Sequence, residues 1–202
     1  MKLKKTIIQY SIACIAIALL LSACEADDPV REDVPEMITK VSMAFTPNGG
    51  GPVIIATATD PDGDGIQDLE IDGEIILESD TEYVLEIELI NGLAQPGTAE
   101  YDVTDEVSEE GAEHMFFFAW TGNLFSDPEG DGNVDDRADA VNYEDEDVEG
   151  NPLGLRTTWT TGAAASGDLR VILKHQPDLK SATSDVNTGE TDLDIAFPVV
   201  IQ

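Results

Sequence analysis

Hydrophobic and polar residues alternate with a period of two along much of the chain after residue 38. In 82–90 and 193–201, apolar side chains occupy every second position, and in 82–90 they alternate with Glu82, Glu86 and Glu88. Because successive side chains of a β-strand point to opposite faces of a sheet, this pattern predicts half-buried strands. We expect about eight strands, at 39–46, 53–59, 69–77, 82–90, 115–120, 156–161, 169–175 and 193–201.

The predicted strands are short and are separated by segments rich in Gly, Pro, Asn and Asp, the residues that favour turns. This arrangement favours one antiparallel β-sandwich of immunoglobulin-like or Greek-key type, with a small β-barrel as the alternative. The short link 78–81 predicts a hairpin between 69–77 and 82–90. The acidic segment 102–113 has valines at helical spacing, and it predicts a short helix or an irregular crossover.

The first 23 residues have the features of a secretory signal peptide: a basic start, an apolar run over 7–21 and small residues at its end. The apolar run is shorter than the roughly 20 residues that a membrane-spanning helix needs. Its last residues, Leu21-Ser22-Ala23-Cys24, also resemble the bacterial lipobox, which implies cleavage before Cys24 and lipid attached to that cysteine. A leader cut near Ala23, with Cys24 left as a free thiol, is the alternative.

Residues 24–37 are polar and contain two prolines, so we predict a disordered tether between the lipid and the domain at 38–202. The acidic cluster directly after Cys24 resembles the export signal of Bacteroidota surface lipoproteins, which implies the cell surface; the periplasmic face of the outer membrane is the alternative. The other cysteine, Cys14, lies in the leader, so we expect no disulfide in the mature domain.

The chain has 42 acidic and 10 basic residues, a net charge of −32. Three of the basic residues lie in the leader and all of the acids follow it, so cleavage leaves 7 basic against 42 acidic residues, or −35. Such a field repels nucleic acid, which excludes nucleic-acid partners, and attracts cations. Calcium in particular prefers many carboxylate oxygens.

Two acidic loops have the spacing of a calcium loop. In 60–68, acids stand at positions one, three, five and nine, with a glycine at six and a carbonyl at seven; the glutamate expected at position twelve is missing, because Ile71 stands there. Segment 127–135 repeats this spacing. The alternative is that both are ordinary interstrand turns. The candidate calcium ligands are Asp60, Asp62, Asp64, Ile66, Asp68, Asp127, Glu129, Asp131 and Asp135.

The chain contains two histidines, His114 and His175, and each lies at the end of a predicted strand near a carboxylate, Glu113 or Asp178. If the two strands are neighbours, the pair could bind zinc, copper or haem. The alternative is that both histidines are structural. No GxSxG elbow, HExxH motif, phosphate-binding loop or mature cysteine nucleophile is present, so we do not expect an enzyme.

Several motifs together resemble a family of small Bacteroidota outer-membrane lipoproteins: Ile38-Thr39-Lys40-Val41, Asp60 to Gly65, Glu113-His114 before Phe116 to Phe118, Asn151 to Leu155, Leu173 to Asp178, and Asp192 to Gln202. Members often carry the label "type 1 periplasmic binding fold superfamily protein", although that fold needs two α/β lobes and a longer chain. Relative to this family, 123–141 is an insertion. The resemblance implies an outer-membrane lipoprotein that is encoded beside a TonB-dependent transporter and is accessory to its uptake system.

These observations predict a lipid-anchored binding module that captures a small ligand or docks on such a transporter. Two alternatives remain open. One is a structural or adhesive surface lipoprotein stabilised by calcium in the acidic loops. The other is a carrier of a metal ion or haem that uses His114 and His175.

Overall fold

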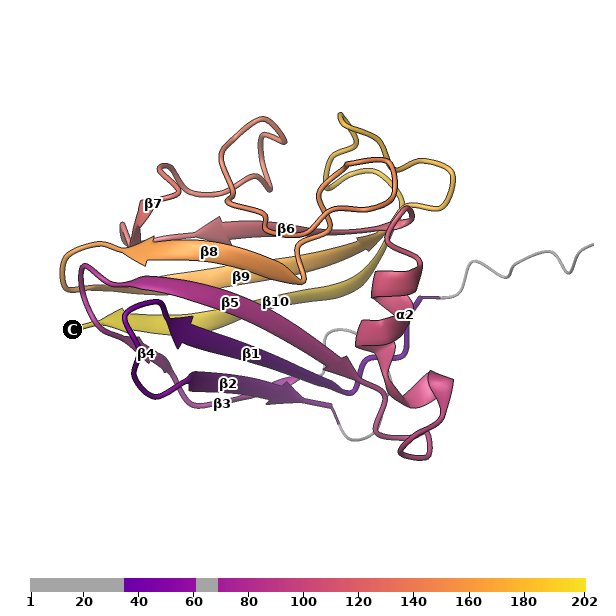
Figure 1. Cartoon of the computed structure of the whole chain (residues 1–202), viewed down its shortest axis with the longest axis horizontal. Coiled ribbons are helices and arrows are strands. Elements are labelled where there is room, and N and C mark those ends of the chain that lie inside the picture. Colours follow the sequence, from indigo (N-terminus) through magenta and orange to yellow (C-terminus); the bar gives the residue numbers. More distant parts are fainter. Residues whose placement is uncertain (1–34, 61–68) are drawn as a thin grey trace, which may run out of the picture. The chain divides into compact units, whose positions relative to one another are not determined.

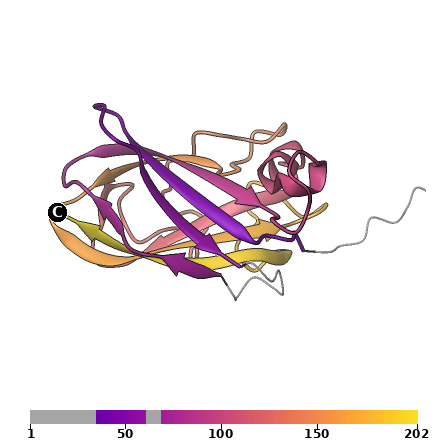
Figure 2. The same ribbon diagram turned by 90° about the horizontal axis from the view of Figure 1, so that it is seen from below.

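The structure is a computed structural model that describes residues 35–60 and 69–202. These residues form two β-sheets stacked face to face, with a short helix across one end of the sandwich (Figures 1 and 2). The elements, in chain order, are β1 (Lys40–Pro47), β2 (Ile54–Thr59), β3 (Glu70–Asp72), β4 (Ile75–Leu77), β5 (Glu82–Ile90), η1 (Ala99–Tyr101), α2 (Val103–Glu109), β6 (His114–Trp120), β7 (Phe125–Asp127), β8 (Arg156–Thr161), β9 (Ala165–His175) and β10 (Glu190–Ile201).

One sheet has the strand order β3-β2-β1-β5-β8-β7, and all of its pairs are antiparallel. The other has the order β4-β10-β9-β6, with β4 parallel to β10 and the remaining pairs antiparallel. Alternating side chains of each strand point into the space between the sheets, as period-two patterning requires. On β1, for example, Val41, Met43 and Phe45 are fully buried.

Aromatic side chains from both sheets join the two layers. Trp159 on β8 is fully buried, and its ring centroid lies 5.4 Å from Phe118, 5.2 Å from Trp120 and 4.7 Å from Phe125. The edge-on and tilted geometries of these pairs are those that aromatic quadrupoles favour. This cluster fixes β6 against the opposite sheet, and β6 begins with one of the two histidines.

The outer face of the second sheet is also covered. Met115, Phe117 and Ile172 form a small second core there, against which side chains of the loops that follow β7 and β9 pack. These loops also occupy the free edge of β6: the Trp120 amide donates to the Asp131 carbonyl at 2.9 Å, and the Phe118 carbonyl accepts from the Asn133 amide at 2.8 Å. The loops therefore form a third layer over the outer face of this sheet.

The prediction of an all-β sandwich is confirmed, and so is the short helix within 102–113. Helix α2 begins after Asp102, whose side chain accepts a hydrogen bond from the Asp105 amide, and it buries Val103 and Val107. Thr104 ties the helix to β5 through hydrogen bonds with the Leu89 backbone. None of the helices in the described ranges is long and apolar enough to cross a bilayer.

Two expectations about the strands are wrong. The predicted strand 69–77 is divided at Gly73, whose φ of +84° turns the chain from one sheet to the other. Consequently β3 pairs with β2 and β4 pairs with β10, so neither forms the expected hairpin with β5. A glycine is suited to this corner because a positive φ is strained for other residues. Strand β7 was not predicted, because a three-residue strand shows no periodicity.

Candidate metal centre

His114 and His175 lie face to face in the interior of the domain. They stand directly opposite each other in the antiparallel pair of β6 and β9, so both side chains leave the same face of the sheet. Their rings are stacked, with centroids 4.6 Å apart and planes 9° from parallel. His114 is completely buried and His175 is 5% exposed. The predicted condition for a shared histidine site, that the two strands be neighbours, is met.

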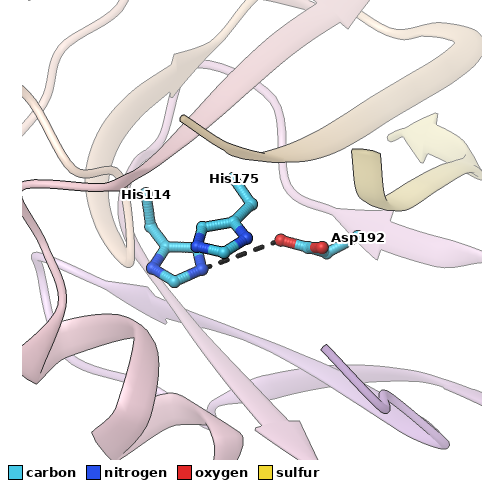
Figure 3. Close-up of side chains that lie close together, drawn as sticks. All are labelled: His114, His175 and Asp192. Carbon is cyan, nitrogen blue, oxygen red and sulfur yellow. Dashed lines mark ion pairs between the residues drawn. The ribbon is translucent and has the colours of Figure 1, made fainter. Parts of the chain in front are cut away.

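Asp192 supplies a carboxylate to the same place (Figure 3). Its Oδ2 atom lies 3.7 Å from Nε2 of His114, and the side chain is fully buried. The register of β10 against β9 shifts between Thr191 and Leu193, so Asp192 is at a β-bulge. Bulges redirect a side chain that regular pairing would place otherwise. One donor atom from each of these three residues lies within 4.8 Å of the others.

Two glutamates flank the pair. The Oε1 atom of Glu36 lies 3.9 Å from Nε2 of His114, and the Glu36 amide donates to Oδ1 of Asp192 at 3.2 Å. On the other side, Oε2 of Glu113 lies 3.4 Å from Nε2 of His175. Three carboxylates thus lie beside two imidazoles, and both kinds of group are donors for a cation.

The backbone sets the tautomer of His114. Its Nδ1 atom lies 3.3 Å from the carbonyl oxygen of Glu110. Because a carbonyl oxygen only accepts, this hydrogen bond requires the proton on Nδ1, so that in the neutral ring the lone pair would be on Nε2. That is the usual arrangement of a metal-binding histidine, whose second nitrogen donates to a carbonyl or carboxylate.

Carboxylates continue from the histidines toward the surface. Oxygens of Glu110 and Glu113 group with a nitrogen of His175, and oxygens of Glu36 and Glu106 group with Glu110, each within 4.8 Å. Helix α2 positions Glu106, and the residue four positions later, Glu110, lies on the same side. Both glutamates line a cleft of about 690 Å³ beside the helix. The buried cluster is thus connected to an acidic surface cleft.

The distances in the cluster are close to those of a metal centre. Metal–nitrogen bonds of 2.0–2.1 Å place tetrahedral ligand atoms roughly 3.4 Å apart. The 3.7 Å between His114 Nε2 and Asp192 Oδ2 is already near this separation. The remaining donor atoms lie within 4.8 Å of one another, and because the two rings are nearly parallel, the imidazoles would have to turn for both lone pairs to meet on one ion.

The candidate calcium ligands have a different outcome. In the first loop the structure describes only Asp60, which is buried and whose amide donates to the Thr39 carbonyl; Asp62, Asp64, Ile66 and Asp68 lie outside the described residues. In the second loop, Asp131 and Asp135 come together with Asp139, which the spacing did not indicate, and all three are exposed. Asp127 and Glu129 are not part of this group. Calcium binding in either loop stays a prediction.

Sequence reasoning identified the two histidines but not all of their neighbours. Asp192 was missed because a bulge breaks the alternation of β10 by one residue and leaves no mark in composition. Glu36 falls within 24–37, the segment whose composition predicts a disordered tether. Glu113 contacts the opposite histidine rather than the adjacent one, and Asp178 is exposed and belongs to none of the ligand groups. The anchor residue Cys24 lies outside the described residues.

Comparison with known proteins yields no matching family model, no matching curated protein and no matching solved structure.

Proposed function

We propose that this protein is a lipid-anchored module of the outer membrane that binds a divalent transition-metal ion through His114, His175 and Asp192, and that it serves metal uptake through a TonB-dependent transporter. One observation carries the metal assignment: two buried imidazoles and a buried carboxylate present donor atoms within 4.8 Å of one another. Imidazole and carboxylate ligands in this number are typical of zinc, and copper(II) binds such donors still more tightly.

Glu36 is the natural fourth ligand. Its carboxylate oxygen lies near the same nitrogen of His114 that faces Asp192, and its side chain is 13% exposed, the most accessible of the four. Since its own amide holds Asp192, a shift of this segment changes two ligands together. The ion would thus enter or leave on the Glu36 side, where the acidic cleft begins.

A bare ion suits this geometry better than haem. A porphyrin has to lie between two axial histidines or beside one, and it needs a large apolar pocket. Here the rings are stacked 4.6 Å apart and are buried, so a macrocycle has no room between them.

The proposed cellular location of the protein is supported by its sequence. The lipobox-like segment ending at Cys24 supports the anchor, and the acidic residues after it, together with the family resemblance, support the outer membrane and the cell surface. A strongly acidic module held at that surface would concentrate cations near a transporter. Labelling cells with a clickable fatty acid tests the anchor: the native protein should be labelled, and Cys24→Ser should not.

Isothermal titration of the metal-free protein with zinc and with copper(II) tests the centre. We expect one ion per chain, and Asp192→Asn should weaken binding by more than about 100-fold, beyond the 10- to 100-fold effect typical of residues around a metal site. Asp178→Asn is the matched control, because it removes an exposed carboxylate three residues after His175 and should leave affinity unchanged.

Electron paramagnetic resonance of the copper(II) form identifies the ligand atoms directly, so its signal distinguishes the loss of a ligand from a loss of folding. Two imidazole nitrogens should couple to the copper, and only one should remain in His175→Asn. Thermal melting of each variant shows whether the metal-free form still folds. Absence of saturable binding of both ions to the folded native protein, or equal binding by Asp192→Asn and Asp178→Asn, would refute the proposal.

A further inference from the structure

A second candidate site lies in the loop layer over the outer face of the sheet that contains β6. It is a pocket of about 450 Å³, bounded by residues 136–141, Tyr143, Pro152 and residues 182–183. None of its lining residues belongs to the candidate metal centre. Most of one wall comes from 123–141, the segment that looks like an insertion in the sequence.

Arg137 lines this pocket and lacks the partner that comparable residues have. Arg156 pairs with Glu86, and Arg170 pairs with Asp194 through two hydrogen bonds. Among the described residues, Arg137 has no carboxylate partner, and its Nε atom is buried without a hydrogen bond. Acids outnumber bases 42 to 10 in this chain, so an arginine left without one is unexpected. A buried donor without an acceptor costs free energy that a bound acceptor would recover.

Two acids in the lining do not fill this role. The Asp136 carboxylate accepts a hydrogen bond from the Ala138 amide at 2.9 Å, within its own turn. The Asp139 carboxylate groups with Asp131 and Asp135 instead. Arg137 is therefore the cationic group of the pocket, and in the part of the chain that the structure describes no ion pair joins it to either acid.

Tyr143 makes one wall rigid. Its hydroxyl donates to the Phe116 carbonyl at 2.7 Å and accepts from the Asn133 side chain at 2.8 Å. Burial raises the pKa of this phenol, while the hydrogen bond from Asn133 and the charge of Arg137 act to lower it. Arg137 and Tyr143 both line the pocket. The remaining walls include small apolar side chains of Ala138, Ala140, Val141, Pro152 and Ala182.

We infer that this pocket binds a small organic carboxylate, with the carboxylate on Arg137 and an apolar body against Tyr143 and the aliphatic wall. A planar guanidinium binds carboxylates through two parallel hydrogen bonds, and the pocket volume lies in the range of small-ligand sites. The inference is independent of the proposed metal function, because it uses a different set of residues.

Two probe acids with matched neutral amides test the inference by nuclear magnetic resonance of the metal-free protein. Benzoate and 4-phenylbutyrate should each cause saturable shifts at 136–143, 152 and 182–183. Benzamide and 4-phenylbutyramide should bind at least about tenfold more weakly, because charge-assisted hydrogen bonds are roughly twice as strong as neutral ones. Arg137→Gln should abolish the preference for the acids, and Arg156→Gln, which removes a paired arginine on the other sheet, should retain it.

Three results would overturn the inference. The first is that neither acid shifts these resonances, and the second is that acids and amides bind equally. The third is that Arg137→Gln, with an otherwise native spectrum, still prefers the acids. Zinc-binding data have no bearing on any of them, so this inference and the proposed metal function fail or stand separately.

Discussion

The ion pair between Lys180 and Asp147 gives a sharp test of how the loop layer is held. Their Nζ and Oδ2 atoms are 2.9 Å apart, and each side chain is only 1% exposed. Lys180 also donates to the Gly111 carbonyl at 2.7 Å. One ammonium group thus joins the loop after β9, the loop before β8 and the segment after α2.

Lys180→Met removes the charge and keeps most of the apolar stem. Removing one partner of a buried pair costs about 3–5 kcal/mol, because the other charge is left uncompensated. Here Asp147 keeps hydrogen bonds from the Glu149 and Asn151 amides, so we expect the lower end, about 3 kcal/mol. At about 2–4 °C per kcal/mol for a chain of this size, the melting temperature should fall by roughly 6–12 °C.

Urea denaturation of the purified protein measures this loss, and Arg170→Met is the matched control. The Arg170–Asp194 pair is 44% and 35% exposed, and screened surface pairs contribute about 0–1 kcal/mol. In 1 M salt the small effect of the control should vanish while the Lys180 effect persists, since buried pairs are screened less. If Lys180→Met costs no more than Arg170→Met, the reasoning that a desolvated charge holds these loops is wrong.

Further predictions concern pH, backbone conformation and calcium. Burial acts to raise the pKa of Asp147, but hydrogen bonds from the Lys180 ammonium and from loop amides outweigh it and lower the pKa below 3.8. The ionised Asp147 carboxylate therefore stabilises the folded state above that pH, and this contribution is lost as the pH falls through the folded-state pKa. In acid titrations, the difference in unfolding free energy between native protein and Asp147→Asn should shrink. Gly132→Ala should lower the free energy of unfolding by more than about 2 kcal/mol in denaturant titrations, because φ at this position is +103° and a Cβ would lie 2.0 Å from a backbone oxygen. Gly130 has a similar φ but open space around it, so Gly130→Ala should lower the free energy of unfolding by about 1 kcal/mol. If the first acidic loop binds calcium, millimolar calcium should raise the melting temperature, and Asp62→Ala or Asp64→Ala should remove the rise; no shift in the native protein would contradict calcium binding.

Much of the fold could be predicted because burial on one face of a sheet imposes a period of two on the sequence. The strands around Phe45, Leu85 and Phe197 show this plainly, and each of these residues is completely buried. Changes of direction leave a weaker mark. Gly73 looked like one glycine within a strand, but its positive φ sends the two halves to different sheets.

The candidate centre was half predictable for a related reason. His114 and His175 are rare residue types at strand ends, so they could be singled out, but their facing register depends on long-range pairing. Asp192 and Glu36 are two acids among 42. The β-bulge in β10 brings Asp192 to the histidines, and Glu36 reaches them because its segment lies beside Asp192, far from it in sequence. Arg137 gave no signal, because an arginine without a partner can be recognised only once the positions of the acids are known.

The covered edge of β6 has a consequence for self-association. Exposed strand edges invite neighbouring molecules to add to a sheet, and this risk grows at the high local density that a shared membrane anchor would impose. The 131–133 loop already takes hydrogen bonds along β6, and the strands at the other three edges, β3, β4 and β7, are three residues long. Crowded copies would therefore find little backbone at the β6 edge, whereas the part of β10 before Val199 pairs with no described strand on its β4 side and is where a neighbouring molecule could add.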